Sequence, residues 1–302
     1  MSKKRKSMIR DSFGDRVFNV VCGAFVLLLI LVVAYPLWFV LMASFSDPTY
    51  VNNGTILIIP RGFQLDGYKM VFENSRLWIT YGNTILYTVL GTALGTMVTV
   101  FAGYAFSRKD LVGGSTLMKL FVFTMYFGGG LIPTYLVIDK LGLVNTRALM
   151  VILGSVSVYN IIIVRSFMVS NISDDLFDAA KIDGCGNGRF FFQIVMPLSK
   201  AVIAIMVLYI AVGHWNSYFN GMMYLSDAKL QPLQVYLREI LVLGSSMAAN
   251  EELDPELQDL MMQMTAIIKY AFIVISTVPI LCVYPFIQKY FVKGMMIGSI
   301  KG

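Results

Sequence analysis

The side chains that could perform acid–base or nucleophilic chemistry are few, and their spacing assembles no catalytic set. The chain has 302 residues but a single histidine, His214, and three dispersed cysteines, Cys22, Cys185 and Cys282. One histidine and no C-x-x-C pair leave no usual metal-binding motif. No G-x-x-x-x-G-K-[ST] phosphate loop occurs, so we expect no ATP hydrolysis here. The residues predict a chain that is not an enzyme and holds no metal or cofactor.

One polar segment stands out, DAAKIDGCGNGRFFFQIVMP at residues 178–197. Just upstream, Ser173 can cap a helix, and the two aspartates after it complement the positive end of that helix dipole. Gly184 can end the helix in a left-handed turn, after which a second short helix can run to residue 196. Pro197 then stands where the chain turns into the next apolar run. The spacing predicts two short helices joined at a glycine elbow.

The elements that must position this segment are membrane-spanning helices. The residues are 57% hydrophobic and 14% charged, and the mean hydropathy is +0.70. Soluble domains carry about 25% charged residues, and about 20 apolar residues suffice to cross a bilayer. We predict an all-α polytopic membrane protein with six spans, at about 17–43, 79–106, 117–138, 147–167, 201–222 and 265–288.

The charge distribution predicts the orientation of these spans. Six basic residues precede the first span: Lys3, Lys4, Arg5, Lys6, Arg10 and Arg16. With both termini cytoplasmic, the inner segments hold sixteen basic and seven acidic residues (+9), and the outer segments eight and eleven (−3). Basic residues accumulate on the cytoplasmic side of membranes. Because membrane orientation accounts for the basic N-terminal tail, the positive charge does not indicate a nucleic-acid partner.

Residues within the spans indicate packing and the absence of ion coupling. Gly91 and Gly95 predict a close helix contact. Four prolines are expected to interrupt spans one, three and six: Pro36, Pro133, Pro279 and Pro285. No Asp or Glu falls within a span as drawn. Ion-coupled transporters usually hold such carboxylates, so any transport energy must come from another polypeptide.

The 178–197 segment resembles the signature loop of ABC importer permeases, E-A-A-x3-G-x9-I-x-L-P. Asp178, Ala179, Ala180, Gly184, Ile194 and Pro197 stand at the family's spacing, with Asp178 in place of Glu and Met196 in place of Leu. In that family the loop is the coupling helix that docks on the ATPase. The resemblance implies an ATPase-coupling role for these matched residues and for Asp183 beside them.

Two further segments resemble the carbohydrate-importer class, that of the maltose transporter's second membrane subunit. The C-terminal QKYFVKGMMIGSIKG is similar to a tail that reaches the ATPase, which implies contacts by Lys293, Gly294 and Gly298. The stretches FGGGLIPTYLVIDKLGLVNT (127–146) and GHWNSYFNGMMYL (213–225) resemble the branch that handles complex oligosaccharides, including uronate-containing ones.

Two segments keep two interpretations each. His214, Trp215, Asn216 and Tyr218 can line a sugar path, since aromatic faces and amide groups suit sugars, or can serve as interfacial anchors. The outer segment 223–264 can dock an external binding protein or simply connect two spans.

The resemblance implies a MetI-like permease domain of type I importers over 17–290. A basic tail precedes it at 1–16, a coupling loop lies at 171–200, and a cytoplasmic tail follows at 291–302. It further implies a homologous second permease, a homodimeric ATP-binding subunit that holds the ATP, and an extracellular solute-binding lipoprotein. The expected function is ATP-driven import of a sugar or oligosaccharide across a bacterial plasma membrane. The alternatives are an ATP-independent secondary transporter or channel, and a non-transporting membrane scaffold.

Overall fold

The computed structural model describes residues 12–55, 58–248, 263–282 and 285, and these are helical with short connections. The helices are α1 (Phe13–Ser44), α2 (Pro48–Asn52), α3 (Asp66–Glu73), α4 (Ser75–Ser107), α5 (Gly114–Tyr126), α6 (Leu131–Lys140), α7 (Arg147–Ile152), α8 (Val158–Asn171), α9 (Asp174–Ile182), α10 (Asn187–Phe190), the π-helix η1 (Phe191–Val195), α11 (Met196–Leu198), α12 (Lys200–Trp215), α13 (Tyr218–Tyr224) and α14 (Leu233–Ala248). A last helix spans Gln263–Cys282. No strand occurs in these ranges, which agrees with the expected all-α class.

The chain divides into two compact units. The first comprises Met1–Lys69 and Ser246–Val274. Its core forms where the end of α1 meets the last helix, because Phe39 packs edge-on against Tyr270 with ring centroids 6.0 Å apart. The Ser44 hydroxyl lies 2.8 Å from the Tyr68 hydroxyl and ties α1 to the start of α3.

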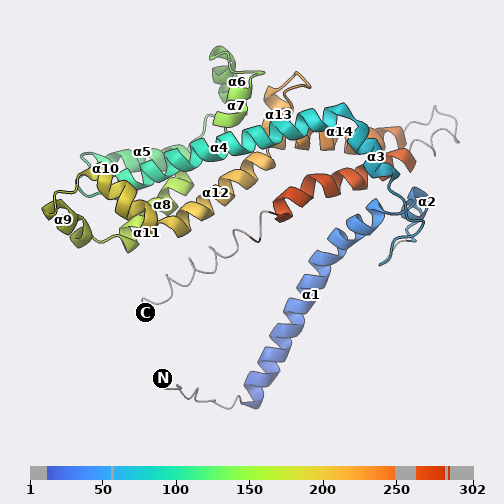
Figure 1. Cartoon of the computed structure of the whole chain (residues 1–302), viewed down its shortest axis with the longest axis horizontal. Helices are drawn as coiled ribbons and strands as arrows, with labels where there is room; N and C mark the ends of the chain where they lie inside the picture. Colours follow the sequence, from blue (N-terminus) through green and yellow to red (C-terminus); the bar gives the residue numbers. More distant parts are fainter. Residues whose placement is uncertain (1–11, 56–57, 249–262, 283–284, 286–302) are drawn as a thin grey trace. The chain divides into compact units, whose positions relative to one another are not determined.

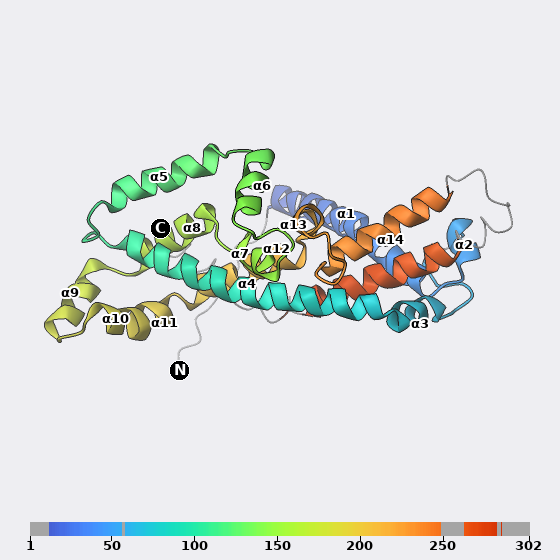
Figure 2. The same cartoon turned by 90° about the horizontal axis from the view of Figure 1, so that it is seen from above.

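The second unit, Met70–Ser245 and Ile275–Gly302, is built around α4. Helices α7, α8 and α12 pack against α4. Helices α9 to α11 lie at the C-terminal end of α4, and α14 lies toward its N-terminal end (Figures 1 and 2). At 1.5 Å per residue, the 33 residues of α4 separate its two ends by about 50 Å.

Glycines allow the close packing around α4. A Cβ at Gly91 would overlap the imidazole of His214, and one at Gly95 would overlap the Ser155 carbonyl. Further along, a Cβ at Gly103 would overlap Val164 of α8. The predicted packing role of Gly91 and Gly95 is confirmed.

Three helices are long and apolar enough to cross a membrane, namely α1, α4 and Gln263–Cys282, and two bent pairs raise that number to at most five among the described residues. The prediction that Pro36 interrupts the first span is wrong, because α1 continues through it. Gln263–Cys282 likewise continues through Pro279. A helix in lipid has no water to satisfy freed backbone groups, so losing one bond to proline costs less than unwinding.

Three of the expected spans are divided. Between α5 and α6 the chain bends by 113° at the glycines preceding Leu131, where Gly130 has φ +84°. The break therefore lies at the glycine run, which is a poor helix former, whereas Pro133 is accommodated in the first turn of α6. The 147–167 span divides into α7 and α8, and Gly154 between them has φ +86°. The 201–222 span divides into α12 and α13.

Candidate functional site

The polar segment forms the two helices that its spacing predicts. The Ser173 hydroxyl accepts a bond from the Leu176 amide at 3.3 Å and caps α9. Gly184 ends α9 with φ +74°, in the region that favours glycine. The Cys185 amide then donates to the Ala180 carbonyl at 2.9 Å, and α10 begins at Asn187. The predicted cap and glycine elbow are confirmed.

One face of α9 is anchored in the second unit's apolar core. Ala180 is buried there, and Phe177 packs edge-on against Phe190 with ring centroids 5.1 Å apart. Phe191, in η1, stacks on Phe101 of α4 at 5.0 Å. Ile194 packs against the same core, so both short helices are held against α4.

The opposite face of α9 is free in this chain. Asp178 and Ala179 are exposed, and so are Asp183 and Gly184 at the helix end. Ile182, the large apolar side chain on this face, is 86% exposed. Sequence reasoning placed Ile182 only as a helix member, although its position four residues after Asp178 sets it on the same face. We call Asp178, Ala179 and Ile182 the outer face of α9.

Basic residues after α4 brace α9. The Arg108 guanidinium lies over the Phe177 ring, 3.3 Å from its centroid, and donates to Asp110 at 3.1 Å. This bond from Arg108 lowers the pKa of the Asp110 carboxyl. Lys109 pairs with Asp174 at 2.5 Å, and the bond raises the pKa of the lysine. Sequence reasoning counted these two cations only as cytoplasmic charges.

Pro197 lies exposed in α11, after which the chain bends by 79° into α12. The expected turn therefore occurs, but at Ser199, two residues after the proline. All six matched residues of the polar segment therefore lie on one continuous structure, although Ala180 and Ile194 face its core while Asp178, Ala179, Gly184 and Pro197 face outward.

The four residues considered for a sugar path do not face a common space. His214 is buried, and its Nε2 lies 3.1 Å from the Ser155 hydroxyl beside Gly91. The Trp215 indole is also buried and donates to the Ser276 carbonyl at 3.2 Å. Asn216 is exposed and donates to the Val212 carbonyl at 2.9 Å. Of the four, Tyr218 lines a polar hollow.

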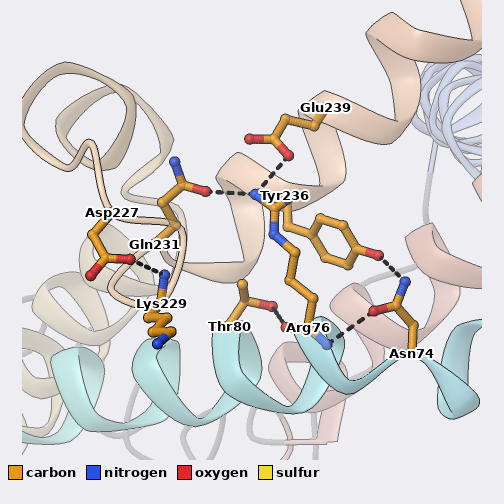
Figure 3. A network of polar contacts seen from close by, with 8 residues as sticks. All are labelled: Asn74, Arg76, Thr80, Asp227, Lys229, Gln231, Tyr236 and Glu239. Carbon is orange, nitrogen blue, oxygen red and sulfur yellow. Dashed lines mark hydrogen bonds and ion pairs between the residues drawn. The ribbon is translucent and has the colours of Figure 1, made fainter.

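A polar network joins the start of α4 to the segment that follows α13 (Figure 3). Arg76 pairs with Glu239 of α14 at 2.7 Å and donates to the Gln231 side-chain oxygen at 2.8 Å. The same guanidinium lies 4.8 Å from the ring centroid of Tyr236, whose hydroxyl accepts from Asn74 at 2.8 Å. Burial raises the pKa of the Tyr236 phenol. These contacts hold α14 at the N-terminal end of α4.

Beside this network lies a hollow of about 400 Å³, which we call the outer hollow. It is lined by Tyr218, Met222, Gln231, Val235, Arg238, Glu239 and Val242. The sequence did not point to Arg238, Gln231 or Glu239. They lie in the 223–264 segment, where no motif or recognisable spacing marks single residues as functional.

A second, apolar groove of about 780 Å³ runs along α4 beside η1 and α12. Thr88, Thr92 and Thr96 of α4 lie along it, and within the described residues their hydroxyls have no hydrogen-bond partner. The tail residues Lys293, Gly294 and Gly298 lie outside the described residues. Among the described residues, no group of three or more His, Cys, Asp or Glu side chains could hold a metal ion.

No family model matches the chain, but known proteins match it over most of its length. The polygalacturonan/rhamnogalacturonan transport system permease protein YtcP of Bacillus subtilis is 38% identical over 288 residues, which cover 95% of this chain and 99% of YtcP. The chain belongs to the permease subunits of ABC sugar importers. This permease is also 26% identical to the arabinooligosaccharides transport system permease protein AraQ of Halalkalibacterium halodurans, over 90% of its own length and 92% of AraQ.

A solved structure extends the comparison. A chain in the crystal structure of a bacterial ABC transporter involved in the import of the acidic polysaccharide alginate has a TM-score of 0.82 and 30% sequence identity with this permease. The match covers 93% of this permease and 99% of the other chain. The permease is thus an integral membrane, non-catalytic transport subunit, since ABC importers carry their ATPase on a separate subunit. Membership of such a system implies a partner permease, an ATPase and a substrate-binding protein.

Proposed function

We propose that this permease forms half of the pathway of an ATP-driven importer for oligosaccharides that contain uronic acids. The substrate class is supported by two of the relatives, one named for polygalacturonan and rhamnogalacturonan and one for the acidic polysaccharide alginate. A homologous second permease supplies the other half. An extracellular solute-binding lipoprotein delivers the sugar, and the chain itself binds no cofactor, because ATP is held by a homodimeric partner subunit.

The proposed topology has six spans with both termini in the cytoplasm of a bacterial plasma membrane. It is supported by the +9 and −3 charge distribution and by the separation of α9 and α14 to opposite ends of α4. The α7–α8 segment and the broken α12–α13 segment then serve as the fourth and fifth spans. Helices α9 and α10 lie inside, and α14 lies outside.

The observation that carries the coupling role is the outer face of α9. This face, with Asp178, Ala179 and Ile182 exposed, is open to a partner, while Arg108 and the apolar core hold the opposite face. We propose that this face, with Asp183, Gly184, Ile194 and Pro197 shaping the elbow, docks on the ATPase. Closure of the ATPase dimer would move α9 and rock the two permeases between inward- and outward-facing states. Lys293, Gly294 and Gly298 are proposed to contact the same ATPase.

Purification of the tagged permease in mild detergent tests the assembly. We expect an ATPase, a homologous permease and a sugar-binding lipoprotein to copurify, and sugar uptake by the reconstituted complex to require ATP. Uptake that followed an ion gradient without ATP would favour the secondary-transporter alternative. A chain that purified without an ATPase, under conditions that preserve other complexes, would also contradict the proposal.

A further inference from the structure

The outer hollow contains one cation, Arg238, among the described residues that line it. Arg238 has no carboxylate within ion-pairing distance among the described residues. Within the part of the chain that the structure describes, its guanidinium donates only from Nη1 to the Met222 sulfur, at 3.1 Å, and lies 5.2 Å from the Tyr218 ring centroid. A sulfur is a weak acceptor. Most of the five N–H donors of Arg238 are therefore not used by the residues that the structure describes.

The neighbouring cation shows the opposite arrangement. Arg76 has a carboxylate partner in Glu239, an amide acceptor in Gln231 and an aromatic face in Tyr236. This pairing occupies Glu239, which is the one carboxylate among the described residues that line the outer hollow. Counting the described residues, two arginines and one glutamate give this region one net positive charge.

The remaining groups complement Arg238 as a polar binding site. Gln231 uses its side-chain oxygen on Arg76, which leaves its amide NH₂ as a donor. Glu239 uses one carboxylate oxygen on Arg76, so the other can accept from a hydroxyl. Donors for an anion thus stand beside an acceptor for hydroxyls, in a hollow of about 400 Å³, within the range of small-ligand pockets.

We propose that the outer hollow binds a hexuronate unit of the transported oligosaccharide, with the sugar carboxylate on Arg238. A planar guanidinium fits a carboxylate through two parallel bonds, which a neutral hexose cannot offer. Gln231 and the free oxygen of Glu239 contact the ring hydroxyls, and Met222 and Tyr218 hold the guanidinium in place. The proposal rests on the proposed function, because it assigns a site to that importer's substrate.

The test compares an acid with its ester. Trigalacturonate and its methyl ester are titrated by saturation-transfer NMR against the assembled importer in nanodiscs, without the binding protein. We expect the acid to bind wild type at least about tenfold more tightly than the ester, since charge-assisted bonds are roughly twice as strong as neutral ones. Arg238→Gln should remove this preference, and Arg238→Lys should restore part of it.

Lys229→Gln is the matched control, because it removes the same charge from an exposed residue outside the outer hollow. It should keep the preference for the acid. Equal binding of acid and ester by wild type, or an unchanged preference in Arg238→Gln, would overturn the proposal. Weaker docking of the binding protein to Arg238→Gln with unaltered sugar binding would also overturn it.

ATP-dependent uptake of trigalacturonate into proteoliposomes separates this proposal from the function on which it rests. If wild type takes up trigalacturonate but Arg238 has no effect on binding, the uronate site is rejected while the importer function stands. Absence of ATP-dependent sugar uptake would reject the importer itself.

Discussion

At the scale of single residues, Gly184 decides the direction of the elbow. Its φ of +74° excludes proline, whose ring holds φ near about −65°. Its amide also donates to the Lys181 carbonyl at 3.1 Å. We expect Gly184→Pro to abolish uptake while the permease still inserts, and Gly184→Asp to have the same effect more mildly because Asp tolerates left-handed φ better than most residues. Uptake and membrane abundance are the measurements.

Gly186 offers the matched control for this change. Its φ of −73° already suits proline, and a Cβ there would meet no atom within 4 Å. Gly186→Pro should therefore leave uptake close to wild type. Normal uptake by Gly184→Pro would refute the coupling role of the elbow.

A second residue-scale prediction concerns the contact between Gly91 and His214. Gly91→Ala places a methyl group against the buried imidazole, and such overpacking costs about 1–3 kcal/mol. We expect a lower unfolding temperature for the purified permease in detergent. Gly82→Ala, on the same helix but facing open space, should not lower it. Equal unfolding temperatures for the two variants would show that α4 and α12 can separate to admit the methyl group.

At the scale of elements, the connection after α4 positions α9. Its two cations, Arg108 and Lys109, contribute unequally to holding α9 in place. The Arg108 side chain is only 17% exposed and contacts both Phe177 and Asp110, whereas Lys109 is 84% exposed. Exposed ion pairs contribute about 0–1 kcal/mol. We expect Arg108→Ala to reduce sugar-stimulated ATPase activity strongly and Lys109→Ala to reduce it little, at equal complex yield.

The two substitutions remove the same charge, so a difference between them reports the packing of α9 and not the charge count. Arg108→Lys should restore only part of the stimulation, because lysine lacks the planar group that covers the Phe177 ring. Equal losses in Arg108→Ala and Lys109→Ala would argue against a bracing role for the Phe177 contact.

At the scale of the whole molecule, the proposed topology places Cys185 inside and the connection before α14 outside. Ala228 is exposed in that connection. In a variant in which serine replaces all three native cysteines, we expect Ala228→Cys to react with an impermeant maleimide in right-side-out vesicles. A variant that keeps only Cys185 should react in inside-out vesicles. The reverse pattern would invert the topology.

The sequence by itself determined the features that depend on neighbouring residues. The Ser173 cap, the left-handed turn at Gly184 and the bend after Pro197 follow from hydrogen bonds and dihedral angles within a few residues. Apolar run lengths likewise revealed the long helices α1 and α4. The 178–197 segment also resembles the signature loop of ABC importer permeases, and the relatives confirm that family.

The tertiary structure decided what depends on packing between distant segments. Asn74 meets Tyr236, 162 residues away, and Arg76 meets Gln231, 155 residues away. No local pattern encodes such pairs, because each forms only when α4 and α14 pack together. Packing of α12 against α4 buries His214 and Trp215, which the sequence left between two interpretations. Packing likewise places Arg238 in the outer hollow without a carboxylate partner among the described residues.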